Sequence, residues 1–106
     1  MNGIIQKHNY VRSKAYTDAA KDQPCAICQR NDGTTVFCHL NKSWAGKGKG
    51  IKADDFAGFD GCYACHLHYD EPRSEPFSDL TILRAMYRTI KNRIERDIII
   101  VKGPKP

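Results

Sequence analysis

The strongest hydrophobic pattern along the chain predicts a helix over about residues 78–97. Apolar side chains recur there at helical spacing, namely Leu83, Met86 or Tyr87, Ile90 and Ile94. Ser78 precedes this run as an N-cap, with Asp79 beside it, and the apolar face can serve the core or a partner. The arginines are expected to form a mostly solvated face, namely Arg84, Arg88, Arg93 and Arg96. Residues 98–101 are apolar enough for a short closing strand.

Two further elements are predicted in the first half of the chain. Ser13 can cap a short helix that continues to Ala20. The turn-forming residues 31–33 precede the β-branched and apolar run 34–38, which predicts a strand ending at His39. The first cysteine pair, this turn and this strand are expected to form one hairpin.

The remaining segments are predicted as loops and one more helix. Residues 1–10 have the pattern of a loosely ordered lead-in, and residues 42–52 are rich in glycine and lysine without apolar periodicity. A helix that begins after Cys62 should end near Asp70, because Pro72 disfavours helical geometry in the residue before it.

The cysteines predict a structural metal site. Four of them form two C-x-x-C pairs, namely Cys25, Cys28, Cys62 and Cys65. A tetrahedral zinc ion takes four thiolates at about 2.3 Å, and each C-x-x-C turn supplies two converging sulfurs. Two disulfides or a redox-active pair are the alternatives, which a reducing compartment disfavours. The fifth cysteine, Cys38, alternates with apolar residues of the predicted strand and is expected to be a buried, inert thiol.

Composition and charge narrow the classes of function. The 106 residues fit a single domain spanning residues 1–106. Lysine and arginine number 17 against 12 acidic residues, a formal charge of +5, which favours nucleic acid as a partner. The longest uncharged apolar run, 98–101, is far shorter than the roughly 20 residues of a membrane span. Polar residues scattered over 1–14 argue against a signal peptide, so a cytoplasmic location is expected.

The segment around the second cysteine pair holds residues suited to acid–base and metal chemistry. Residues 29–61, between the two pairs, place His39 at a strand end and include Asp55, while His66 and Asp70 follow Cys65 and share one helix face. Phosphodiester hydrolysis needs a base to deprotonate water and a Lewis acid to stabilise charge. A neutral histidine can be that base at physiological pH, and a divalent ion held by His66 and an aspartate can be that acid.

The glycine- and lysine-rich loop predicts contact with phosphate. Glycines let the backbone approach a phosphate closely, and lysines neutralise it. The candidate nucleic-acid contacts are Asn41, Lys47, Lys49 and Lys52. Alternatively, these lysines only make a flexible, soluble loop. Trp44 can stack on an unpaired base or cover a small core.

At these residues the chain resembles the HNH group of the His-Me finger (ββα-metal) nucleases, in which a hairpin ends in a histidine and C-x-x-C-H opens a helix. More narrowly, residues 11–70 resemble phage and prophage nucleases of the YbcO type. The motifs that carry this resemblance are V-R-S-K-A near Val11, C-A-I-C, D-G-T-T-V, H-L-N at His39, G-K-G-K-G-I-K-A-D-D and C-Y-A-C-H-L-H-Y-D. The resemblance implies DNA cleavage with a divalent ion in phage recombination, replication or packaging, in the cytoplasm of a host cell.

The resemblance also implies roles for single residues. His39 matches the general base, and His66 matches the helix ligand of a catalytic Mg²⁺ or Mn²⁺ ion. The four paired cysteines match the ligands of a structural Zn²⁺ ion.

Two positions depart from the HNH pattern. Many HNH enzymes place a metal-binding aspartate immediately before the base, whereas this chain has Cys38, a soft ligand poorly suited to magnesium. The middle asparagine of the pattern has its nearest counterpart in Asp55. Asp70 and Asp55 are therefore the candidates for the second ligand of the catalytic ion, with Asn41 a weaker one.

The sequence thus predicts an α+β fold, with a zinc-stapled ββα-metal core over about residues 22–72 and flanking N- and C-terminal helices. The predicted function is a metal-dependent DNA endonuclease, and the resemblance to the HNH family implies products with a 5′ phosphate and a 3′ hydroxyl. A non-catalytic zinc-ribbon module that binds nucleic acid is the rival interpretation, and it needs neither His39 nor His66. A zinc-dependent protein–protein adaptor is the third, and it predicts no salt-dependent affinity for nucleic acid. No membrane partner is expected, and the sequence leaves open whether the protein is a monomer or a homodimer.

Overall fold

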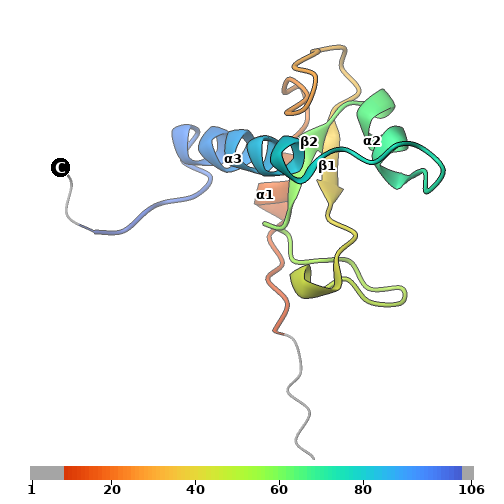
Figure 1. Ribbon diagram of the computed structural model, residues 1–106. Coiled ribbons are helices and arrows are strands. Elements are labelled where there is room, and N and C mark those ends of the chain that lie inside the picture. The colour runs from red at the N-terminus through yellow and green to blue at the C-terminus, as the bar shows by residue number, and fades with distance from the viewer. Residues whose placement is uncertain (1–8, 104–106) are drawn as a thin grey trace, which may run out of the picture.

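The computed structural model describes residues 9–103, which form an α+β arrangement of a two-stranded sheet and surrounding helices (Figure 1). In chain order the elements are α1 (Lys14–Asp18), β1 (Val36–His39), the 3₁₀ helix η1 (Ser43–Ala45), β2 (Gly58–Gly61), α2 (Tyr63–Asp70) and α3 (Asp79–Glu95). The α+β class expected from the sequence is therefore confirmed. The predicted lead-in and the end of the chain fall largely on residues 1–8 and 104–106, outside the described residues.

The helices predicted after Ser13 and after Ser78 have the expected caps. The Ser13 hydroxyl accepts a hydrogen bond from the Tyr16 N–H at the start of α1, and the Ser78 hydroxyl accepts one from the Thr81 N–H at the start of α3. Helix α1 is shorter than predicted, because regular helix ends at Asp18 and turns follow.

The strand pairing differs from the predicted hairpin. β1 pairs antiparallel with β2, with Cys38 opposite Phe59 and His39 opposite Gly58. The prediction that the first cysteine pair and β1 form a hairpin is therefore wrong. Glycine and aspartate disfavour strands, which hid β2 in the sequence. The close packing requires its glycines, since a Cβ at Gly58 would lie 2.7 Å from the Phe37 ring.

The two faces of the sheet meet different helices. Side chains alternate along a strand, so Phe37 and His39 share one face and Cys38 lies on the other. Tyr16 of α1 makes an edge-on ring contact with Phe37 at 5.5 Å between centroids. Tyr69 of α2 makes one at 5.3 Å with Phe59, the partner of Cys38. Helices α1 and α2 accordingly lie on opposite sides of the two strands (Figure 1).

Helix α3 has the predicted position in the sequence but buries a different face. Its buried residues are Ala85, Thr89 and Arg93. Arg93 is fully buried, so its predicted solvated position is wrong. By contrast, several members of the predicted apolar face are exposed, namely Leu83, Tyr87 and Ile94. The buried face of α3 packs against β2. Thr89 and Arg93 can be buried there because each forms a hydrogen bond with Asp60.

Three smaller expectations have mixed outcomes. Helix α2 ends at Asp70 as predicted. Of the loop predicted over 42–52, residues 43–45 form the 3₁₀ helix η1 instead, and residues 46–52 form a loop with one isolated bridge between Gly48 and Ile51. Residues 98–101 form no strand, and Ile100 and Val101 are exposed. Among residues 9–103, no helix has the length and apolar character needed to cross a membrane.

Candidate functional site

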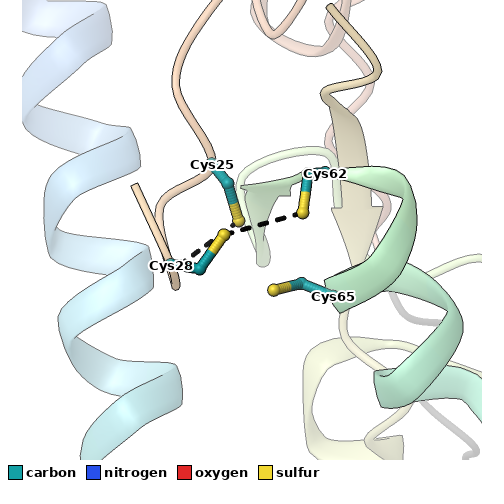
Figure 2. Close-up of side chains that lie close together, drawn as sticks. All are labelled: Cys25, Cys28, Cys62 and Cys65. Atoms are coloured by element: carbon teal, nitrogen blue, oxygen red, sulfur yellow. Dashed lines mark hydrogen bonds between the residues drawn. The ribbon is translucent and has the colours of Figure 1, made fainter. Parts of the chain in front are cut away.

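Four cysteine side chains converge where the first cysteine turn meets the start of α2 (Figure 2). Cys25 and Cys28 come from the turn after Pro24, and Cys62 and Cys65 from the N-cap and first turn of α2. Two N–H groups of the first turn point at the Cys25 sulfur, from Ile27 at 3.4 Å and from Cys28 at 3.5 Å. This brings together, across 33 intervening residues, the four cysteines that the sequence singled out.

The cluster fits a zinc ion. All four Sγ atoms lie within 4.8 Å of one another, and those of Cys28 and Cys62 are 3.7 Å apart. Tetrahedral ligands about 2.3 Å from zinc are about 3.8 Å from each other. All five cysteines are free thiols, so the structure does not contain the two disulfides that were the alternative. The four paired cysteines could therefore hold a zinc ion, whose role at such a closed site is structural.

The electrostatics of the cluster suit a cation. Burial opposes ionisation of Cys25, but the N–H groups of Cys28, Cys62 and Ile27 outweigh it and lower the pKa of this thiol to about 7. For Cys65, burial and then the neighbouring Cys25 raise the pKa above its usual value. Without a cation, the four sulfurs cannot all ionise at this separation, and a divalent ion would remove that conflict.

Cys38 lies outside this cluster and is buried, as the sequence predicted. Burial, followed by the charges of Asp70 and Cys25, raises the pKa of its thiol far above the usual value. A side chain held in the neutral thiol form is a poor ligand for a hard cation.

His39 ends β1 and is held by a buried carboxylate. Its Nε2 lies 2.8 Å from Oδ1 of Asp55, and the two side chains are 17% and 8% exposed. The Phe37 ring contacts the imidazole edge-on at 4.9 Å. His39 also lines a broad groove of about 560 Å³ between β1 and α1, together with Thr17 and Lys21. The imidazole is thus fixed on one side and faces an open groove.

Asp55 is an acceptor in this pair. The Ser13 N–H donates to its Oδ2 at 2.7 Å, and the Arg12 guanidinium lies 3.4 Å from its Oδ1. Burial favours the neutral acid, but the hydrogen bonds from His39 and Ser13 and the nearby charges of His39 and Arg12 outweigh it and lower the pKa of Asp55. An ionised carboxylate only accepts, so Nε2 of His39 carries the proton, and in neutral His39 the lone pair is on Nδ1. Nδ1 makes no hydrogen bond with residues 9–103.

Sequence reasoning missed part of this arrangement. Arg12 and Ser13 hold Asp55 from more than 40 positions away, and the neighbouring Asp54 is buried and accepts a hydrogen bond from the Val11 N–H. Only the V-R-S-K-A motif marked the N-terminal segment, and it did not indicate what these residues contact.

The second histidine–aspartate pair lies on α2. His66 Nε2 is 3.0 Å from Oδ2 of Asp70, the spacing of four that the sequence predicted to share a helix face. His68 instead lies 2.6 Å from the Glu75 carbonyl oxygen. Within residues 9–103, the four cysteines are the only group of three or more histidine, cysteine or acidic side chains close enough to hold a metal ion together. Asp55 therefore does not join His66 and Asp70.

The two pairs lie over different faces of the sheet. His39 shares a face with Phe37, which packs on α1, while α2 packs on the opposite face through Tyr69 and Phe59. Of the residues that the sequence proposed as ligands of a catalytic ion, His66 and Asp70 contact each other, whereas Asp55 contacts His39.

The remaining predicted site residues are the candidate nucleic-acid contacts, which follow β1 in the chain. Three lysines of the loop after η1 are exposed, namely Lys47, Lys49 and Lys52. The Lys52 carbonyl oxygen accepts a hydrogen bond from Arg12, which links the loop to the segment that holds Asp55. Asn41 is also exposed, and its side chain is bonded to Tyr69.

Comparison with known proteins identifies no relative. The chain matches no protein-family model, no curated protein and no solved structure. The resemblance to HNH nucleases consequently rests on the sequence motifs.

Proposed function

We propose that this protein is a zinc-stabilised, metal-dependent DNA endonuclease of the HNH type, in which His39 is the general base. The observation that supports this most strongly is the His39–Asp55 pair: the carboxylate fixes the imidazole through Nε2 and leaves Nδ1 as the acceptor. A histidine oriented by a buried carboxylate beside an open groove is the usual arrangement of a general base.

In the proposed reaction, Nδ1 of His39 takes a proton from water. The oxygen of that water attacks phosphorus, and the bond from phosphorus to the 3′ oxygen breaks. The leaving oxygen takes a proton from solvent, so the products carry a 5′ phosphate and a 3′ hydroxyl. Asp55 keeps the imidazole in position and stabilises the imidazolium that forms, which is the role an orienting carboxylate has beside a catalytic histidine.

The order of the elements supports the ββα-metal interpretation. β1 ends in His39, β2 follows after a loop, and α2 begins within the second cysteine pair. Asp55, which the sequence could match to the middle asparagine of the HNH pattern or to a metal ligand, contacts His39. This supports the first of those two assignments.

A divalent ion would supply charge neutralisation at the leaving oxygen. His66 and Asp70 are the residues that would hold it, and magnesium commonly binds through only one or two carboxylates with water and substrate phosphate. Water and the substrate phosphate would fill the other positions around the ion.

A non-catalytic zinc module that binds nucleic acid remains the alternative, and one observation favours it. The His39 pair and the helix that carries the His66 pair belong to opposite faces of the sheet. Base and metal ion must meet at one phosphate in the enzyme, whereas a binding module has no such requirement.

Cleavage of supercoiled plasmid by zinc-loaded protein tests the proposal. Magnesium, manganese and buffer without an added divalent ion are compared for the wild type, His39→Ala and Asp55→Asn. Asp97→Asn is the matched control for Asp55→Asn, because Asp97 is an exposed aspartate that does not line the His39 groove. We expect metal-dependent nicking by the wild type and by Asp97→Asn, with a loss of at least about 100-fold in His39→Ala.

The remaining outcomes separate the alternatives. Equal nicking by the wild type and His39→Ala would overturn the assignment of the base. Tight, salt-sensitive DNA binding without nicking under any metal would favour the binding module, and absence of salt-sensitive binding would favour the protein–protein adaptor.

A further inference from the structure

A cavity of about 290 Å³ lies outside the two histidine–aspartate pairs and the cysteine cluster. It is enclosed by η1, the end of α2, the linker that follows and the first turns of α3. Its apolar lining includes Leu40, Trp44, Tyr69, Phe77, Leu83 and Met86. Leu40 follows the last residue of β1, so the cavity adjoins the end of this strand.

Trp44 gives this cavity an exposed aromatic wall. The side chain is 72% exposed, the largest exposure of any described aromatic residue. The backbone that carries it is held in place, because Ala45 is buried beside it and Gly46 ends η1 in a left-handed conformation with φ of 94°. The Tyr10 hydroxyl also donates to the Gly46 carbonyl oxygen at 3.0 Å. An exposed tryptophan on an anchored backbone is suited to stacking on a planar ligand.

Asn41 adds an oriented donor to the same cavity. The Tyr69 hydroxyl accepts a hydrogen bond from the backbone N–H of Asn41 at 3.1 Å. The same hydroxyl donates its single proton to the side-chain Oδ1 of Asn41 at 2.9 Å. This pair of bonds fixes which end of the amide is oxygen. The Nδ2 group is left with both N–H donors unused by residues 9–103, although Asn41 lines the cavity.

The charges around the cavity are divided between its two sides. Lys42 lines the side formed by η1, and Lys47 and Lys49 follow in the adjoining loop. Glu71 and Asp79 line the opposite side, where Arg73 forms an ion pair with Glu71 at 3.1 Å. A phosphate backbone would be attracted to the first side, whereas Asp79 would repel it from the second, so a neutral, planar group is better suited to enter the cavity.

We propose that this cavity binds one unstacked nucleobase of a DNA strand. The base stacks on Trp44, the Nδ2 group of Asn41 donates to an acceptor on its edge, and the phosphates on either side follow Lys42, Lys47 and Lys49. Because a base must leave a duplex to enter, the cavity makes the protein prefer single-stranded or locally unpaired DNA. The proposal rests on DNA being the substrate, and it adds a structural preference that the histidine pairs do not provide.

The fluorescence of Trp44 measures occupancy directly, because it is the only tryptophan of the chain. Zinc-loaded His39→Ala protein, which should bind without cutting, is titrated with a short single-stranded oligonucleotide and with the duplex of the same sequence. We expect strong quenching by the single strand, little by the duplex, and at least about tenfold tighter binding of the single strand.

Two substitutions test the contacts, with binding followed by anisotropy of a labelled strand. Trp44→Ala should weaken single-strand binding by about 5- to 100-fold. Asn41→Asp keeps the acceptor for Tyr69 but replaces the donors with an anionic oxygen, so it should weaken binding similarly. Tyr87→Ala removes an exposed aromatic residue of α3 that does not line the cavity, and should leave binding unchanged.

The outcomes distinguish this proposal from that of the nuclease. Wild-type cleavage with no change in Trp44 fluorescence, or equal quenching by duplex and single strand, would overturn the nucleobase site and leave the enzyme intact. Quenching by the single strand without cleavage under any metal would support the site and overturn the enzyme. Failure to bind either form of DNA at low salt would overturn both.

Discussion

Arg93 of α3 and Asp60 of β2 form a fully buried, bidentate ion pair, with N···O distances of 2.7 and 2.6 Å. The third nitrogen of the guanidinium, Nε, donates to the Tyr16 carbonyl oxygen at 2.8 Å. The guanidinium also lies 5.0 Å from the centre of the Tyr16 ring. A single side chain therefore links α3, β2 and α1, which together support the face of the sheet that carries His39.

Replacing Arg93 by alanine should lower the free energy of unfolding by about 3–5 kcal/mol, because it leaves the Asp60 carboxylate buried without a partner. Urea denaturation of the zinc-loaded protein measures this change. Arg84→Ala, at an exposed position of the same helix, should stay within about 0.5 kcal/mol of the wild type. Equal effects of the two substitutions would contradict the structural role of the buried pair.

Gly58→Ala should also destabilise the fold, by about 1–3 kcal/mol. The new Cβ would lie 2.7 Å from the Phe37 ring and closer still to the Cys38 carbonyl oxygen, so both strands would have to move apart. Gly48→Ala is the matched control, because the nearest atoms to its Cβ would be 3.8 Å away. Thermal unfolding of both variants at the same zinc concentration would show a lower midpoint only for Gly58→Ala.

Each chain should bind one zinc ion, and the four clustered cysteines should hold it. Metal analysis of purified protein is expected to show loss of zinc in Cys28→Ser and Cys65→Ser, because each removes one thiolate ligand. Cys38→Ala should retain full zinc content, since Cys38 is outside the cluster. A chelator should remove the metal and lower the helical circular dichroism signal, because binding and folding are coupled. Unchanged zinc content in Cys28→Ser would argue against a four-cysteine site.

Cys38 should resist alkylation in the zinc-loaded protein at mildly alkaline pH. The side chain is fully buried, and burial raises the pKa of its thiol, so almost none is present as the reactive thiolate. Its folded pKa exceeds the unfolded value of 9.0, so Cys38 favours the unfolded chain as pH rises past that value. Mass spectrometry after reaction with iodoacetamide should therefore show no label at Cys38 until the protein is denatured. Labelling of native Cys38 at the rate of a free thiol would contradict this burial.

The features that local chemistry determines were predictable from the sequence. The N-caps at Ser13 and Ser78, the end of α2 before Pro72 and the convergence of the cysteine pairs each depend on a few neighbouring residues or on the fixed ligand geometry of a metal. The features that failed depend on partners distant in sequence. β2 has a composition that disfavours strands. Arg93 is buried because it forms an ion pair with Asp60, which lies 33 positions away in the sequence.

The candidate site divides in the same way. The spacing of His66 and Asp70 indicated their contact, whereas nothing in the sequence brought Arg12 and Ser13 to Asp55. The placement of His39 on the face of the sheet opposite to α2, which carries His66, could have been anticipated. Side chains alternate along a strand, so the burial of Cys38 on one face puts its neighbour His39 on the other. A match of motifs does not take this alternation into account.

The first cysteine turn also covers one edge of the sheet. On the outer side of β2, the Asp60 carbonyl oxygen accepts a hydrogen bond from the Ala26 N–H at 2.7 Å, and the Asp60 N–H donates to the Thr89 hydroxyl at 3.0 Å. Ala26 lies within the turn that presents Cys25 and Cys28. Release of the metal would free this turn and uncover a strand edge able to pair with other chains. Metal loss would then cause aggregation as well as reduced stability, and zinc supply during expression would govern how much soluble protein is recovered.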